Sequence, residues 1–207
     1  SGELWGTAAS SGTVAKSHAL LEKLIGGASG EHIWDAPPDP AEVAAAWQSL
    51  TQDERDDLIR EVPWVIGNLP GLPFDVRDTA NRKMVEFYQQ HPYGLSPDQL
   101  KLMAQVNDIL QREAEQVGKY GTGRPSIQIV SLDLTNGVPK VAVGYGDLDT
   151  ATHTSWGVPG INSDAPDGLV NWDDASMNLY RMQNRIEGFT GTNAVVAWLG
   201  YDTPSDP

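Results

Sequence analysis

The sequence contains no cysteine. Disulfides, a thiolate nucleophile and metal sites built from cysteine are therefore excluded, although the redox compartment stays open. Basic residues are also scarce, with 14 Lys and Arg against 28 Asp and Glu, which gives a formal net charge of -14. A surface with this charge repels phosphate backbones and anionic membranes, so we expect no nucleic-acid partner.

Long apolar runs are missing as well. No stretch approaches the roughly 20 consecutive apolar residues of a membrane span, and Ser1 to Ser11 lack the charged and then apolar pattern of a secretion signal. We therefore expect a soluble chain with no membrane span. Because the chain begins at Ser1, an upstream segment that carries a signal is an open alternative, and both a cytoplasmic and a secreted location stay open.

Signatures of metals and cofactors are also lacking. Counting from Asp147 places Thr152 and Val158 where a calcium-binding EF-hand loop needs Gly and Glu. The glycine pairs at 121 and 123, and at 144 and 146, lack the third glycine of a dinucleotide fingerprint. The four histidines contain no helical pair four residues apart, as a zinc site would require. We expect neither a metal nor a cofactor.

The pattern of the sequence changes near residue 121. We take this point as a domain boundary between a helical region, 1–120, and an α/β region, 121–207. Helical periodicity precedes this point, and short β-rich runs follow it. Thr51 with Glu54 forms a capping-box pattern, and Ser96, Pro97 and Gln99 mark another helix start. The expected helices cover 14–25, a segment through Trp47, 51–63, 77–90 and 96–118.

Two helices carry apolar residues that recur at helical spacing. In the first region they are Leu100, Met103, Leu110, Ala114 and Val117. In the second region a helix that ends at Gly188 carries Ala175, Leu179, Met182 and Ile186.

The second region begins with a pattern of period two. Ile127, Ile129 and Leu132 alternate with polar residues, and Asn136-Gly137 suits a tight hairpin turn before Val141 and Val143. A third run covers 153–158, and the helix follows it after a Pro-Gly loop. The fourth run, 194–199, is unbroken and apolar, as is typical of a strand covered on both faces. The predicted order is hairpin, strand, helix, strand.

Local strings make this order more specific. Those that carry a resemblance are Trp47 to Leu50, Arg55, Leu58-Ile59, Pro63, Ile66-Gly67-Asn68-Leu69, Gly71-Leu72-Pro73, Arg77-Asp78, Ala80-Asn81-Arg82, Gly146-Asp147-Leu148-Asp149-Thr150-Ala151, His153, Val158-Pro159-Gly160, Ala197-Trp198-Leu199-Gly200-Tyr201-Asp202 and Pro204. In this order, from about Trp47 to the end of the chain, they resemble an actinobacterial family of α/β hydrolases of uncharacterised function.

This resemblance implies an α/β fold in which an all-helical N-terminal region is followed by the first half of an α/β-hydrolase sheet. It also implies a serine hydrolase that acts on a small ester, lipid or amide. In the family a helix and a strand lead on to a Gly-His-Ser-Tyr-Gly-like nucleophile elbow, with an acid and a His further along. This sequence contains no Gly-x-Ser-x-Gly, so we expect the chain alone to be an inactive N-terminal part.

Two groups of residues are candidate sites. In the fold it resembles, the loop Gly160, Ile161, Asn162 and Ser163 would offer a backbone amide, from Ile161 or Asn162, to an oxyanion. The alternative is a simple Pro-Gly turn. Ser155 and His153 lack elbow and triad surroundings, so structural roles are expected for them. Asn68, Arg77, Asp78, Asn81 and Arg82 are interpreted as a polar network that fixes the loop from Asn68 to Pro73, with ligand binding as the alternative.

Two functions compete. In the first, the chain is part of a serine hydrolase. Its third strand, Thr154 to Val158, then has an unpaired side, which we expect the C-terminal remainder of the hydrolase to cover. That remainder comes either from the same precursor, cut in the tail 202–207, or from a second chain. In the second, the helical region is a protein-interaction or targeting module on a truncated scaffold. The residues Trp5, Trp34, Trp47 and Trp64 are expected to pack between helices, or under the second reading to bind a partner.

Overall fold

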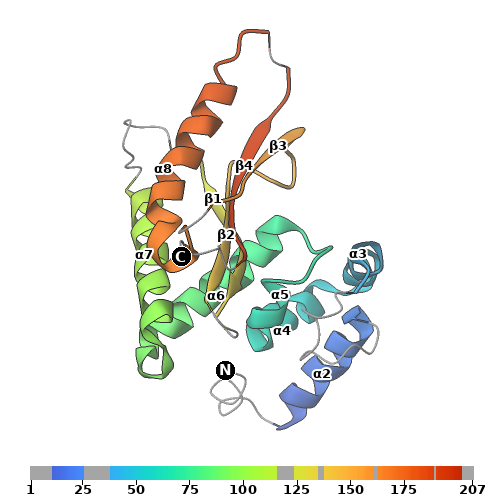
Figure 1. The fold of residues 1–207 in the computed structure, drawn as a ribbon. Helices are drawn as coiled ribbons and strands as arrows, with labels where there is room; N and C mark the ends of the chain where they lie inside the picture. Colours follow the sequence, from blue (N-terminus) through green and yellow to red (C-terminus); the bar gives the residue numbers. More distant parts are fainter. Residues whose placement is uncertain are drawn as a thin grey trace.

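A four-stranded mixed sheet forms the centre of the molecule (Figure 1). The structure is a computed structural model that describes residues 11–25, 38–115, 124–134, 138–160, 163–188 and 190–201. The strand order is β1-β2-β4-β3, with antiparallel pairing of β1 with β2 and of β2 with β4, and parallel pairing of β3 with β4. The strands are β1 (Ile127–Asp133), β2 (Lys140–Tyr145), β3 (His153–Gly157) and β4 (Asn193–Leu199).

The order of the elements along the chain confirms the predicted hairpin, strand, helix and strand. β1 and β2 form the antiparallel pair, although the predicted turn at Asn136-Gly137 lies outside the described residues. β4 is central, and its residues from 193 to 197 are buried whichever face they point to. The unbroken apolar run therefore marked a strand covered on both faces.

Two helices, α7 (Pro97–Ala114) and α8 (Ala165–Gln183), lie side by side on one face of the sheet (Figure 1). Alternate strand residues point towards them, because side chains alternate across a strand. The resulting core combines Leu102, Met103, Val106 and Ile109 of α7 with Leu169 and Met177 of α8, and with Ile127, Ile129, Leu132, Val141, Val143, Tyr145, Val195, Ala197 and Leu199 of the sheet.

The opposite face of the sheet carries a smaller buried cluster. Its members are Val130, Ala142, Leu148, Ala194 and Val196, with Phe74 and Ala151 packed against them. A register shift between Ile129 and Ser131 explains why Val130 and Leu132 belong to different clusters.

The remaining helices lie beside the sheet. α6 (Phe74–Gln90) runs along β1, followed by the short 3-10 turn η1 (Pro92–Gly94). α2 (Ser11–Ile25), α3 (Pro40–Ser49), α4 (Gln52–Glu61) and α5 (Pro63–Ile66) share a second core with Val43, Trp47, Leu58 and Ile66 fully or almost fully buried. The capping box of Thr51 and Glu54 is present, and Ser96 forms another with Gln99.

The apolar residues that recur along α7 are only partly buried. Met103 is buried and Leu110 is partly buried, but Leu100 and Ala114 are exposed, and Val117 lies outside the described residues. The helix has several apolar flanks, and the one that fits against the sheet and α8 consists of Leu102, Met103, Val106 and Ile109.

The apolar residues that mark one face of this helix in the sequence are not the residues that α8 buries. Ala175, Leu179, Met182 and Ile186 are exposed, and Ile186 lies beyond the end of the helix. The buried face instead contains Ala165, Gly168, Leu169, Asp173, Ser176 and Met177. Small residues let the helix approach the sheet closely, and Asp173 is buried with charged partners, so a hydrophobicity pattern could not reveal this face.

Candidate functional site

The loop that joins β3 to α8 lies beyond the carboxyl ends of the two parallel strands, where ligand sites form in α/β sheets. It leads directly into the N-terminus of α8, where Asp164 accepts a hydrogen bond from the Asp167 amide at 3.3 Å. The free amides of a helix N-terminus favour negative charge nearby. The position therefore suits a developing anion.

The structure describes part of the predicted oxyanion loop. Gly160 is exposed, and a Cβ added to it would meet no atom within 4 Å, so the loop borders open space at this residue. Ser163 is half-buried at the start of α8. Ile161 and Asn162, the two expected amide donors, lie outside the described residues.

Tyr201, which follows β4, holds the base of this loop. Its hydroxyl donates a hydrogen bond to the carbonyl of Pro159, and its ring stacks on Trp198 with centroids 5.8 Å apart. Gly200 between them makes room, because an added Cβ would overlap the Trp198 side chain. The carboxyl ends of β3 and β4 are thus tied into one unit. Tyr201 stands in one of the strings that carry the resemblance, but nothing in the sequence indicates this contact.

Ser155 and His153 lie within β3 rather than at its carboxyl end. The Ser155 hydroxyl accepts a hydrogen bond from Gln183 Nε2 at 2.7 Å, on the side of the strand that faces α8. The ring of His153 lies with Nδ1 3.0 Å from the hydroxyl of Thr152. Ser155 therefore has a structural partner and stands within a strand, not on a turn after one.

The predicted polar network is assembled on the free edge of β1. Asn68 binds both the amide and the carbonyl of Leu132, at 2.8 and 3.0 Å. Asp78 accepts from the Ile129 amide at 2.7 Å, and Asn81 donates to the Ile129 carbonyl at 2.8 Å. Arg82 donates to the Ile127 carbonyl at 3.0 Å.

A further residue, which sequence analysis missed, completes this row. Glu113 of α7 accepts from the Ile127 amide at 2.7 Å and pairs with Arg82 at 3.0 Å. The side chains of the network and Glu113 therefore take the place of a neighbouring strand along β1. No local signal in the sequence connects Glu113 with β1, because the contact joins two elements across an intervening loop.

Two side chains of the network contact Gly67, the residue just before the predicted loop from Asn68 to Pro73. Asn81 donates to the carbonyl of Gly67 at 2.7 Å, and a Cβ on Gly67 would overlap the Asn81 side chain. Arg77 makes weaker contacts, with Nε 3.5 Å from the same carbonyl and the guanidinium 5.6 Å from the Phe74 ring. Burial lowers the pKa of Arg77 to about 10, which the charge of Asp149 only partly opposes.

The pKa values of two charged residues in the network, Asp78 and Arg82, differ from their ordinary values. Burial raises the pKa of Asp78, although the Ile129 amide and Arg82 stabilise its ionised form. Burial also disfavours the charge on Arg82, but the carboxylates of Asp78 and Glu113 outweigh this effect and raise its pKa. The ion pairs are thus part of a partly buried structural unit.

The loop after β2 is tied to the helical region. Asp149 accepts hydrogen bonds from the amides of Phe74 and Asp75 at 2.7 and 2.9 Å, so it caps the N-terminus of α6 from a distant part of the chain. Asp147 accepts from the Asp149 amide and the Thr150 hydroxyl. Both carboxylates therefore have structural partners.

A buried charge cluster under α8 was also missed. Asp173 is fully buried and accepts from Arg124 at 3.0 Å, from the Tyr145 hydroxyl at 2.9 Å and from Arg112 at 3.4 Å. Its position on an apolar-looking helix gives no hint of this role. In the described ranges, no group of three or more His, Cys, Asp or Glu side chains could hold a metal, and no helix there is long and apolar enough to cross a membrane.

The order β1-β2-β4-β3, with α8 as the crossover between the parallel strands, is that of the first half of an α/β-hydrolase sheet. Residues 135–207 match the family described as Alpha/beta hydrolase. The resemblance and the fold class predicted from the sequence are thereby confirmed.

The relatives found among curated proteins are themselves uncharacterised. Two proteins of Mycobacterium tuberculosis, from strains CDC 1551 and H37Rv, are each 33% identical to the chain over 202 residues, which covers 85% of this chain and 30% of theirs. The chain therefore spans about a third of the length of the curated relatives it matches. No solved structure matches it significantly.

Proposed function

We propose that this chain supplies the oxyanion-hole loop of a serine hydrolase. The nucleophile, acid and base come from the remainder of the hydrolase, either in the same precursor or in a second chain. The observation that carries the proposal is the loop after β3, which borders open space at Gly160 and leads into the N-terminus of α8. In this sheet order the loop occupies the position from which α/β hydrolases stabilise an oxyanion.

The chemistry follows from the charge that acyl transfer creates. When a nucleophile attacks an ester or amide, the carbonyl oxygen becomes negative in the transition state. Backbone amides of Ile161 or Asn162 donate to this oxygen, and the dipole of α8 adds to the stabilisation. Removal of one such donor typically lowers kcat by about 10² to 10³.

The placement of Ser155 supports a nucleophile from outside the chain. Its hydroxyl is engaged by Gln183 inside β3, whereas a nucleophile elbow needs an exposed Ser on a sharp turn after a strand. We therefore assign no catalytic residue to this chain. The substrate class we propose is a small ester, lipid or amide.

The site is completed by a strand beside β3. Among the described residues, β3 pairs only with β4 and ends the sheet on that side. A parallel strand added there would end next to the loop after β3, because carboxyl ends of parallel strands meet at one edge of the sheet. An elbow that follows this added strand would face the oxyanion loop.

The competing interaction-module function is less well supported. α6 and α7 share buried contacts with the sheet, and the polar network binds β1 throughout its length. The helical region thus resembles a built-in part of the α/β unit more than a separable module.

The test uses a chimera in which residues 1–207 replace the matched segment of the longer M. tuberculosis protein. A fluorophosphonate probe should label a Ser outside residues 1–207. Ile161→Pro or Asn162→Pro, which lacks an amide hydrogen, should slow labelling about 10² to 10³-fold. Tyr93→Ala, at a fully exposed residue outside the loop, is the control and should label at the unmodified rate. Labelling of Ser155, or no labelling of the folded chimera, would contradict the proposal.

A further inference from the structure

The chain leaves the sheet after Gly157, the last residue of β3. Val158 is 49% exposed and Gly160 is exposed, but Pro159 between them is buried. The carbonyl of Pro159 accepts the hydrogen bond from the Tyr201 hydroxyl. The loop after β3 therefore begins with one fixed residue between two exposed ones.

This hydrogen bond fixes the orientation of a whole peptide unit. The Pro159 carbonyl and the Gly160 amide belong to one planar trans peptide, in which the C=O and the N–H point in opposite directions. Because the carbonyl is directed at Tyr201, the Gly160 N–H points away from Tyr201. Tyr201 thus sets the direction in which the backbone enters the loop.

The Tyr201 ring is itself held from the side of β4. It stacks on Trp198 with the ring centroids 5.8 Å apart and 20° between the ring planes. Gly200 permits this stack, because an added Cβ would overlap the Trp198 side chain. Leu199, the last residue of β4, is almost fully buried. A ring held on a buried strand end presents its hydroxyl in one place, as a positioning group must.

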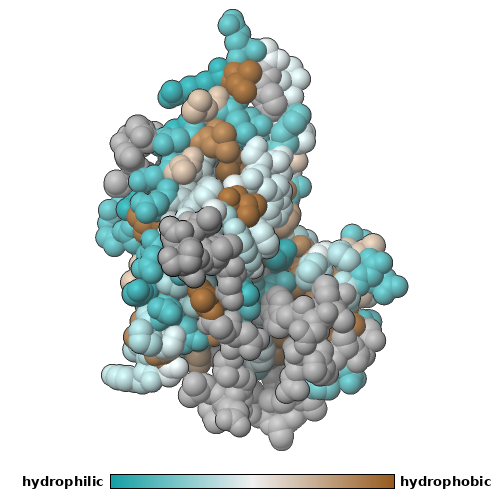
Figure 2. All heavy atoms as spheres, in the orientation of Figure 1, coloured by the Kyte–Doolittle hydropathy of each residue, from teal (hydrophilic) through white to brown (hydrophobic). Residues whose placement is uncertain are grey.

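The other end of the loop is fixed at the first turn of α8. Gln105 of α7 donates to the Pro166 carbonyl and accepts from the Val170 amide at 2.9 Å. Leu169 of the same turn is fully buried. The carboxyl end of α8 is different, since Met182 is 68% exposed and Figure 2 shows hydrophobic atoms at the surface there. The end of α8 that receives the loop is therefore anchored independently of Tyr201.

The two ends of the loop differ in how many groups hold them. The α8 end is held by side chains of α7 and by the core. At the β3 end, the bond from Tyr201 is the one hydrogen bond that holds Pro159 or Gly160 within the described ranges. Removal of a single hydroxyl would therefore free this end and leave the other in place.

We propose that Tyr201 is a positioning residue of the oxyanion site, which holds the Pro159–Gly160 peptide so that the amides that follow reach the substrate oxygen. This inference rests on the proposed function, because it assigns Tyr201 a part in the same acyl transfer. The hydroxyl acts through the backbone and not on the substrate. Its loss should slow the chemical step and spare binding, since the amides stabilise a charge that develops only in the transition state.

The test introduces Tyr201→Phe into the chimera with the M. tuberculosis protein. Phe keeps the ring that stacks on Trp198 and removes only the hydroxyl. Labelling by a fluorophosphonate at several concentrations separates the maximal rate from the concentration that gives half of it. We expect the maximal rate to fall about three- to tenfold, the factor by which a typical hydrogen bond shifts an equilibrium. The half-maximal concentration should not change.

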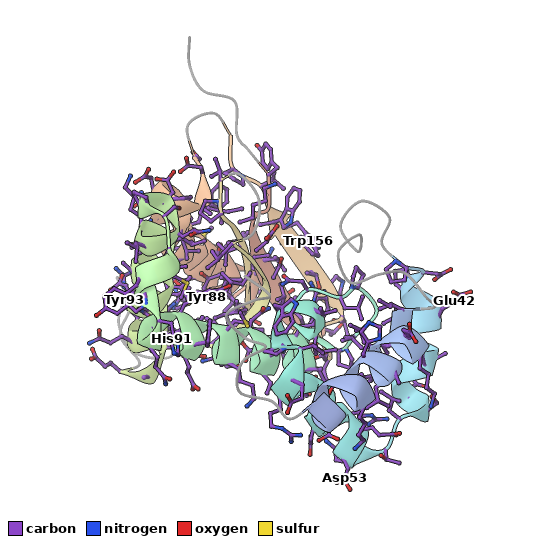
Figure 3. The ribbon with its side chains drawn as sticks, turned by 90° about the horizontal axis from the view of Figure 1, so that it is seen from below. Glu42, Asp53, Tyr88, His91, Tyr93 and Trp156 are labelled. Atoms are coloured by element: carbon purple, nitrogen blue, oxygen red, sulfur yellow. The ribbon has the colours of Figure 1, made fainter. Side chains whose placement is uncertain are left out.

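Tyr93→Phe is the matched control, because it removes the same hydroxyl from a fully exposed side chain. Figure 3 shows Tyr93 well apart from Trp156, which lies on the strand that leads to the loop. This variant should label at the unmodified rate, and circular dichroism should show both variants folded.

A double variant separates positioning from a general loss of stability. In whichever of Ile161→Pro and Asn162→Pro slows labelling, the amide that Tyr201 positions is already missing. Added Tyr201→Phe should then slow labelling no further, because residues that act through one group are not additive.

Nuclear magnetic resonance of residues 1–207 tests the contact without any activity. Tyr201→Phe should shift the amide resonance of Gly160 and leave those of His153–Gly157 unchanged. An unshifted Gly160, an unchanged maximal rate, a change only in the half-maximal concentration, or additive effects in the double variant would overturn the inference and leave the proposed function standing. A folded chimera that no fluorophosphonate labels would overturn the proposed function, and this inference with it.

Discussion

Asp173 is the clearest case of a single residue that joins several elements. Its carboxylate lies under α8 and accepts from Arg124 before β1, from Tyr145 at the end of β2 and from Arg112 of α7. A buried ion pair contributes little net stability when intact, but the loss of one partner leaves the other charged and desolvated.

We therefore expect Asp173→Ala to lower the free energy of unfolding by about 3 to 5 kcal/mol, because the guanidinium of Arg124 is left buried without its carboxylate. Urea denaturation monitored by fluorescence measures the change. Asp167→Asn is the control, since that carboxyl is exposed and lies 3.4 Å from Lys101, and it should change stability by less than about 1 kcal/mol. A similar loss in both variants would contradict the assignment.

Tyr145 gives a pH dependence with a defined sign. Burial, and then the neighbouring Asp173 carboxylate, raise its pKa well above the ordinary value of 10.0. The folded state therefore keeps the phenolic proton that the unfolded state releases. The contribution of Tyr145 to the free energy of unfolding is therefore fully present below pH 10. It falls as the pH rises above 10, by up to about 1.4 kcal/mol per pH unit.

The measurement is the free energy of unfolding at several pH values from 8 to about 11. Tyr145→Phe should lose stability at pH 8 through the missing hydrogen bond, yet its profile should fall less steeply above pH 10. Parallel profiles for the two proteins would show that Tyr145 is not the group responsible.

At the scale of elements, the side chains of the network bind the outward amides and carbonyls of β1, which a neighbouring strand would otherwise bind. Edge strands in natural proteins are commonly covered or charged to prevent pairing with other chains. Here the cover is built from individual side chains of α6, α7 and the turn after α5. The sequence marked Asn68, Asp78, Asn81 and Arg82 as a polar group, but β1 as their target could be seen only in the fold.

Asn68→Ala should be the most damaging change to this cover, because it frees both the amide and the carbonyl of Leu132. A loss of about 1 to 3 kcal/mol is expected for each buried group left without a partner. Denaturation gives the stability, and hydrogen exchange should show faster exchange at Leu132. Asn171→Ala on the exposed side of α8 is the control and should be neutral.

Helix positions were predictable from the sequence, whereas helix faces were not. Caps such as Thr51 with Glu54 act locally, so they can be recognised without knowing the fold. The buried face of α8 depends on what it contacts, and a charged Asp173 and small Gly168 were buried in place of Leu179 and Met182. The exposed apolar residues would be anomalous in a finished surface and are expected at an interface.

At the scale of the whole molecule, the strand order and the open side of β3 followed from the resemblance, and the covered side of β1 did not. The division at residue 121 stays a prediction, and α6 and α7 share a core with the strands on its other side. The position of the proposed oxyanion loop was expected from the resemblance, and the two residues proposed as its amide donors, Ile161 and Asn162, lie outside the described residues.

The difference between the two edges can be measured in the isolated chain. Both β1 and β3 are edge strands, so strand position alone predicts similar hydrogen exchange for their outward amides. The side chains of Glu113, Asp78 and Asn68 hold the amides of Ile127, Ile129 and Leu132, and exchange requires those bonds to open. We expect these three amides to exchange at least tenfold more slowly than the β3 amides that do not face β4. Equal rates along both edges would mean that the network does not close β1.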